Sequence, residues 1–134
     1  MNKAISLLLA VVGLIHLLPL SGVLGAERLA ALYGLSFDDP NLQIMMRHRA
    51  VLFGLLGAFL LAAAFKPQLQ ACAFVAASVS TLSFLWFAWA VGGYNEAIAR
   101  IVAADLVAVV CLAVALVLYL VRHRAVASAR AAGS

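Results

Sequence analysis

Charged residues are scarce in this chain: Asp, Glu, Lys and Arg make up 10% of its 134 residues, whereas hydrophobic residues make up 67%. Soluble domains are about 25% charged and about 45–50% apolar, so a water-soluble globule could not cover its surface with this composition. Intrinsic disorder is excluded for the opposite reason, because the chain has ample apolar surface to bury. The composition therefore predicts an integral membrane protein with room for about four spans of ~20 residues.

Patterns that bind metals or nucleic acids are also lacking. The two cysteines, Cys72 and Cys111, form no CxxC pair and fall in apolar segments, where free cysteine usually acts as a small hydrophobe. A metal site built from His16, His48 and Asp105 has no HxxxH or HExxH spacing to support it. The basic residues are scattered at segment ends without interleaved aromatics, despite a net charge of +4. We therefore predict no metal, no cofactor and no nucleic-acid partner.

What the chain does contain is four long apolar segments. The predicted spans are about residues 4–24, 46–65, 70–91 and 101–121. Residues 122–134 are predicted to form a basic, flexible tail. Pro19 cannot donate a hydrogen bond to the carbonyl of Ile15, so we expect a local kink in the first span.

Local signals predict where the helices begin and end. Residues 25–34 form a short amphipathic piece that is expected to stop at Gly34. Asp39 can cap the next helix, with Pro40 at its first position. This helix should run to Phe65, because Lys66-Pro67 ends it. Further along, Gly92-Gly93 breaks the third span, and Asn95 can cap the fourth.

Short connections between neighbouring spans favour an all-α, up-down four-helix transmembrane bundle formed by residues 1–134 as a single domain. Gly54, Ala58 and Ala62 recur every four residues, which predicts that this face of the second span packs closely on other helices. The distribution of Lys and Arg favours both termini in the cytoplasm. In that orientation the cytoplasmic basic residues are Lys3, Lys66, Arg122, Arg124 and Arg130, and the outer ones are Arg28, Arg47, Arg49 and Arg100.

Ionisable residues inside a bilayer are costly and call for a partner or a use. The chain offers His16, Arg47, Arg49 and Asp105, all at depths that converge on the outer leaflet, and we predict these as ligand-binding residues. Arg47 shares a helix face with Gly54 and is therefore the expected inward partner of Asp105. Arg49 lies roughly 200° away and is expected to extend toward lipid headgroups.

Purely structural interpretations remain open beside the functional ones. Arg47 and Asp105 could form a pair that merely locks two helices together. His16 could hydrogen-bond to Ser80 or Ser83 on the third span. Arg47-His48-Arg49 could be a collar that contacts headgroups. The aromatic run that contains Trp86 and Trp89 is typical of an interfacial belt.

The stretch Arg47-His48-Arg49-Ala50-Val51-Leu52-Phe53-Gly54, after a first span that ends with a histidine and a proline, resembles the DoxX-like small bacterial membrane proteins. The resemblance covers nearly the whole chain as an architecture, and this octapeptide is its most specific part. It implies a four-helix bundle in the bacterial inner membrane. Some relatives are linked to quinone-coupled sulfur oxidation, but no catalytic residue is carried over to this chain.

Three functions follow as hypotheses. The first is the binding or carriage of a small amphipathic or lipophilic molecule in an outward-facing polar pocket. The second is an enzyme, either a membrane-embedded isomerase that uses His16 and Asp105 as an acid–base pair or a quinone-linked oxidoreductase. The third is a structural subunit of a larger membrane complex. The expected partners are the lipid bilayer and a lipophilic small molecule or quinone, with a homo-oligomer or a membrane complex as alternatives.

Overall fold

The computed structural model describes residues 3–132, with side chains described through residue 129. Every regular element in this range is a helix. In chain order the elements are α1 (Lys3–Leu17), the 3₁₀ helix η1 (Leu18–Leu24), α2 (Ala26–Tyr33), α3 (Pro40–Phe65), the 3₁₀ turn η2 (Pro67–Leu69), α4 (Gln70–Val91) and α5 (Glu96–Ala132).

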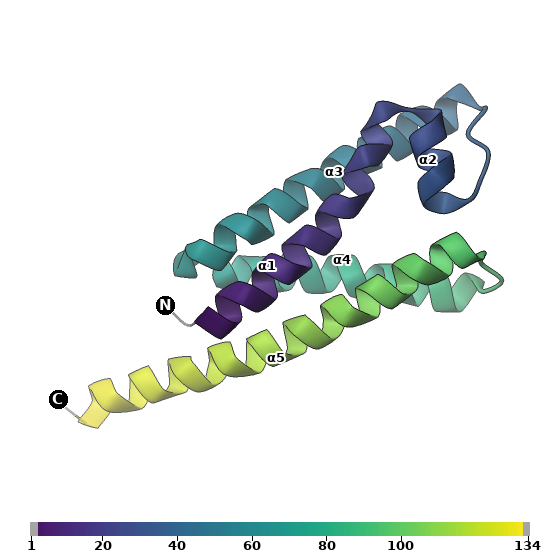
Figure 1. The fold of residues 1–134 in the computed structure, drawn as a ribbon. Coiled ribbons are helices and arrows are strands. Elements are labelled where there is room, and N and C mark those ends of the chain that lie inside the picture. The colour runs from purple at the N-terminus through teal and green to yellow at the C-terminus, as the bar shows by residue number, and fades with distance from the viewer. Residues whose placement is uncertain (1–2, 133–134) are drawn as a thin grey trace.

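Four helical stretches are long and apolar enough to cross a membrane, which agrees with the four predicted spans. They are Lys3–Leu24, Pro40–Phe65, Pro67–Val91 and Glu96–Ala129. Consecutive stretches run in opposite directions, so that both ends of the chain lie at the same end of the bundle (Figure 1). The all-helical class and the up-down order of the helices are therefore confirmed.

The local signals place the helix ends correctly. The Asp39 carboxylate accepts a hydrogen bond from the backbone N–H of Asn41 at 2.8 Å, and Pro40 is the first residue of α3. Asn95 Oδ1 accepts from the backbone N–H of Ile98 at 2.9 Å and so caps α5. Gly34 ends α2 in the left-handed conformation, with φ of 65°, as expected of a C-terminal glycine.

The first span changes its helix type beside Pro19. The α-helix ends at Leu17, and the chain continues to Leu24 as a 3₁₀ helix. Proline has no N–H to donate to the carbonyl four residues earlier, which removes one bond of the α-helical ladder at this point. The expected disturbance at Pro19 is therefore a tightening of the helix over seven residues.

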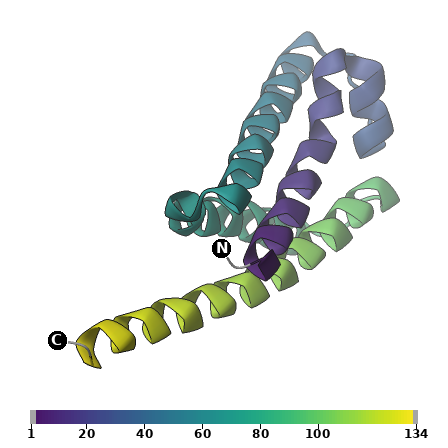
Figure 2. The ribbon, with the colours of Figure 1, turned by 60° about the vertical axis from the view of Figure 1, so that its left-hand side comes forward.

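The segment after Val121 continues the last long helix. The basic tail predicted for residues 122–134 is helical as far as Ala132, because α5 continues to that residue and is 37 residues long. Alanine and arginine are strong helix formers and dominate this segment, which contains no proline or glycine before Gly133. Gly133 and Ser134 lie outside the described residues. In both views α5 extends well past the other helices (Figures 1 and 2).

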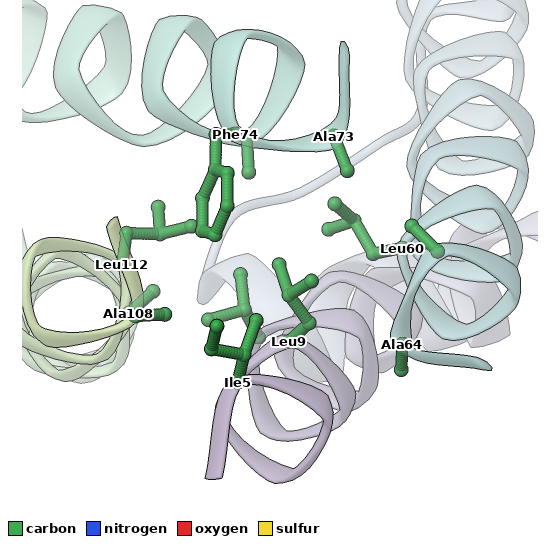
Figure 3. Packing of buried hydrophobic residues seen from close by; sticks show 12 residues of the cluster. Ile5, Leu9, Leu60, Ala64, Ala73, Phe74, Ala108 and Leu112 are labelled. Atoms are coloured by element: carbon green, nitrogen blue, oxygen red, sulfur yellow. The ribbon is translucent and has the colours of Figure 1, made fainter. Parts of the chain in front are cut away.

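The main apolar core lies toward the end of the bundle that holds the termini. All four long helices contribute to it. Figure 3 shows Phe74 of α4 reaching toward Leu112 of α5 and Ile5 of α1, while Leu60 of α3 lies beside Leu9. The buried core residues of α1 are all fully buried: Ile5, Leu9 and Val12.

Helices α1 and α3 approach each other closely at two glycines, Gly13 and Gly57. A Cβ atom on Gly57 would lie 2.9 Å from the carbonyl oxygen of Gly13 and 2.8 Å from Leu17 Cγ. The predicted stripe of Gly54, Ala58 and Ala62 is thus only partly right, because Gly54 is buried but Ala58 is exposed and Ala62 is half-buried. The next buried residue of α3 after Gly54 is Gly57 and not Ala58. Residues that contact a neighbouring helix are spaced three or four positions apart, so a step of three is as usual as a step of four.

Candidate functional site

A cavity of about 350 Å³ lies at the end of the bundle opposite the termini. Six elements contribute residues to its walls: α1, η1, α2, α3, α4 and α5. The lining residues are Ile15, His16, Leu18, Pro19, Ala31, Leu32, Tyr33, Arg49, Phe53, Phe84, Ala97, Arg100, Ile101, Ala104 and Asp105. Three of the four predicted site residues are among them: His16, Arg49 and Asp105.

Helix α2 covers this end of the bundle. Figures 1 and 2 show it turned back between the start of α3 and the start of α5. Its buried residues Leu29 and Tyr33 form a second, smaller apolar cluster with Phe37, against which Met46 of α3 and Ile98 of α5 pack. The short helix α2 therefore covers the cavity, and its buried side chains pack in a cluster that is separate from the main core.

Asn95 fastens the end of α2 to the start of α5. Its Nδ2 donates hydrogen bonds to the carbonyl oxygens of Tyr33 at 2.9 Å and Gly34 at 3.3 Å. The same side chain caps α5 through its Oδ1, as described above. The Asn95 side chain thus links α2 to α5. It needs its amide N–H donors for the carbonyls at the end of α2 and its amide oxygen for the cap of α5.

Asn95→Asp should release α2 while keeping the cap of α5. The carboxylate retains the acceptor for Ile98 but loses the two donated bonds, each worth about 0.5–1.5 kcal/mol. We expect amide hydrogen exchange in Ala26–Tyr33 to become about tenfold faster, because this helix opens locally more often. Exchange measured by mass spectrometry should leave the first turn of α5 unchanged. Equal protection of α2 in the variant and the parent would contradict this role.

Arg49 lies in the cavity wall among three aromatic rings. Its Nη1 donates a hydrogen bond to the Tyr33 hydroxyl at 3.0 Å. The guanidinium carbon lies 4.8 Å from the ring centre of Phe53, 5.5 Å from that of Tyr33 and 5.9 Å from that of Phe84. These rings come from α3, α2 and α4, so three elements hold the guanidinium in place by cation–π contacts.

Arg47 does not reach the cavity. It is exposed, and its Nε donates to the carbonyl oxygen of Val23 in η1 at 2.9 Å. The prediction that Arg47 turns inward to pair with Asp105, while Arg49 extends outward, is therefore wrong. The two arginines do lie on opposite sides of α3, but the side of Arg47 meets η1 and the side of Arg49 meets the cavity.

Asp105 is predicted correctly as a group inside the bundle, although with the wrong partner. Its side chain is 9% exposed and lines the cavity. Within residues 3–129 it has neither a hydrogen-bond partner nor an ion pair within 4.0 Å. Arg49 is the cation that acts on it electrostatically. The carboxylate is thus available to whatever enters the cavity.

His16 is held by two hydrogen bonds and a stacked ring. Its Nδ1 lies 2.9 Å from the carbonyl oxygen of Val12, and its Nε2 lies 3.3 Å from Ser80 Oγ. A carbonyl oxygen can only accept, so Nδ1 carries the proton, and in the neutral ring Nε2 accepts from Ser80. The ring also stacks on Phe53 at 5.8 Å. The structural interpretation of His16 as a partner of Ser80 is confirmed.

The other charged and aromatic residues of the cavity were not predicted from the sequence as site residues: Tyr33, Phe53, Phe84 and Arg100. Phe53 follows Arg49 by four residues and therefore lies on the same face of the helix. This spacing is a signal for Phe53, but it was missed because that face was predicted to meet lipid. Arg100 lies one turn before Ala104, which also lines the cavity, whereas Asp105 lies about 100° further around α5 than Ala104. Tyr33 and Phe84 have no signal of this kind, because their positions depend on how α2 and α4 pack.

No group of three His, Cys, Asp or Glu side chains in the described part of the chain could hold a metal ion. The arrangement instead offers cations, one carboxylate and apolar walls. A scan against protein-family models and searches of curated proteins and of solved structures found no match to this chain.

Proposed function

We propose that this protein is a multi-pass protein of the bacterial inner membrane that binds or carries a small amphipathic molecule in the cavity. The observation that supports this proposal most directly is the composition of the cavity: mostly apolar side chains surround the Arg49 guanidinium, and Arg100 and Asp105 also line the same space. A volume of about 350 Å³ is near the lower end of the ~300–1,000 Å³ usual for ligand pockets.

The apolar surface of the long helices supports a location inside a bilayer. Large hydrophobic residues are exposed along all four of them, for example Leu7, Leu55, Val75 and Val110, each at least 63% exposed. An apolar surface of this extent would aggregate in water, and lipid is the solvent that it suits. The resemblance of the RHRAVLFG stretch to DoxX-like proteins supports the bacterial inner membrane as the location and that family as the relatives.

The distribution of basic residues supports both termini in the cytoplasm, as argued from the sequence. The cavity then lies toward the outer side of the membrane, because it is at the opposite end of the bundle. A ligand would place its polar head among Arg49, Arg100 and Asp105 and its hydrocarbon part along Ile15, Leu18 and the aromatic rings.

The geometry of Arg49 suits an anionic or carbonyl head. One of the five N–H donors of the guanidinium serves Tyr33. The stacked rings restrict the side chain, so that little conformational entropy is lost when the remaining donors meet a ligand. A cation fixed in this way binds an acceptor more strongly than a mobile surface arginine would.

Binding of radiolabelled dodecanoate to the protein in lipid nanodiscs tests the proposal. Arg49→Ala should weaken binding tenfold or more, because a hydrogen bond to a charged group contributes about 1.5–3 kcal/mol. Arg47→Ala is the matched control: it removes the same side chain two residues earlier, outside the cavity, and should change the affinity less than twofold. Equal effects of the two substitutions, or no binding above that of empty nanodiscs, would overturn the proposal.

A further inference from the structure

The Asp105 carboxylate is an acceptor with unused capacity. It is about nine-tenths buried, it lines the cavity, and among the residues that the structure describes none donates a hydrogen bond to it. An ionised carboxylate can accept about four hydrogen bonds. Burying such a group without partners is costly, particularly at membrane depth. A group that enters the cavity and donates a hydrogen bond would recover part of this cost.

The other polar groups around the cavity do not supply that donor. Arg49 acts on Asp105 through its charge but lies beyond the 4.0 Å of an ion pair, and its Nη1 bond goes to Tyr33. His16 directs its Nδ1 to Val12 and its Nε2 to Ser80. Arg100 is exposed at the rim. One cavity thus presents free donors on Arg49 and a free acceptor on Asp105.

We propose that the polar head of the ligand carries a hydrogen-bond donor, a hydroxyl or an ammonium group, beside its anionic or carbonyl acceptor. Asp105 accepts from the donor, and Arg49 donates to the acceptor. Both residues line the same space of about 350 Å³ and act on each other electrostatically, so one compact head can meet both. This inference rests on the proposed binding function and narrows its ligand to amphiphiles with a donor–acceptor head.

Three probes with the same twelve-carbon chain separate the contributions of the head. Dodecanoate has the acceptor alone, 2-hydroxydodecanoate adds a hydroxyl donor, and 2-aminododecanoate adds an ammonium donor. We expect one or both of the donor-bearing probes to bind the parent protein in nanodiscs about tenfold tighter than dodecanoate, as a hydrogen bond to a charged acceptor provides. The probe with the larger gain identifies the donor as a hydroxyl or an ammonium.

Asp105→Leu should abolish that gain, so that the affinity ratio between the better donor-bearing probe and dodecanoate falls to about one. Dodecanoate itself should bind as well as before or better, because the substitution removes a negative charge beside an anion. Asp105→Asn keeps the size of the side chain, and its neutral amide oxygen should reduce the ratio severalfold. This second variant provides the test should the leucine variant fail to fold.

Arg49→Ala provides the opposite control: the affinity for every probe should fall while the ratio stays near tenfold. A parent protein that binds all three probes equally would overturn the inference about Asp105, and the binding function would stand. A ratio that persists in Asp105→Leu would also overturn it, because the donor would then be recognised elsewhere. Failure of all three probes to bind would instead remove the proposed function.

Discussion

Replacing Gly57 with valine should lower the free energy of unfolding by about 1–3 kcal/mol, the usual cost of overpacking a tight contact. Even the Cβ atom would meet the Gly13 carbonyl oxygen at 2.9 Å and Leu17 Cγ at 2.8 Å. Leu17 could change its rotamer, but the carbonyl belongs to the backbone of α1 and could move only with that helix. The substitution therefore has to separate α1 from α3.

Unfolding by SDS titration in mixed micelles, followed by circular dichroism, measures this effect. Ala58→Val is the matched control, since it adds two methyl groups at the next residue of α3, where the side chain is exposed. We expect the control to differ from the parent by less than about 0.5 kcal/mol, as surface substitutions usually do. If Ala58→Val were the more damaging change, the contact between α1 and α3 would have to be placed on the other face of α3.

Labelling of introduced cysteines should give an all-or-none answer on topology. In a background of Cys72→Ala and Cys111→Ala, Ser36→Cys lies in the exposed connection before α3, and Ser128→Cys lies in the exposed part of α5 beyond the bundle. On the proposed topology a membrane-impermeant maleimide should modify position 36 in intact spheroplasts. Position 128 should react after permeabilisation.

Exchange of serine for cysteine changes one atom, so neither variant is expected to alter the fold. The reverse pattern of labelling would place the termini outside and the cavity toward the cytoplasm. It would leave the cavity and its residues as they are, so the test of topology is independent of the binding measurements. Labelling of both positions in intact spheroplasts would contradict the four-span topology itself.

The helix boundaries could be predicted from the sequence because they depend on neighbouring residues. Asp39 and Asn95 cap the helices that follow them through bonds to N–H groups two or three residues away. Gly34 and the Lys66-Pro67 pair end helices through their own backbone preferences. Nothing in these effects requires knowledge of the tertiary contacts, and the structure agrees with each of them.

The choice between Arg47 and Arg49 could not be made in the same way. Helical periodicity gives the angle between the two side chains, and the structure confirms that they lie on opposite sides of α3. It does not say which neighbour each side meets. The choice relied on a small-residue stripe extended through Ala58, whereas the buried line turns to Gly57. That one-residue shift turns the packed face of α3 by about 100°, so the stripe through Ala58 could not show which of the two arginines faces the cavity.

The convergence of His16 and Asp105 was predictable from depth, since their distances along the helices place them at the same end of the bundle. The aromatic surroundings of Arg49 were not. Tyr33 reaches the guanidinium because α2 folds back over the cavity, and Phe84 does so because α4 packs beside it. Contacts of this kind join elements that are distant in sequence, and no local pattern specifies them.

The continuous helix of α5 sets the reach of the C-terminus. At ~1.5 Å per residue its 37 residues measure about 55 Å, whereas the hydrocarbon layer is ~30 Å thick. On the proposed topology Arg122 and Arg124 would lie among the phosphates of the inner leaflet. The last turns of α5 would extend into the cytosol as a continuous helix. A reporter domain fused to this end would therefore be held at a distance from the lipid surface instead of being joined to it by a flexible linker.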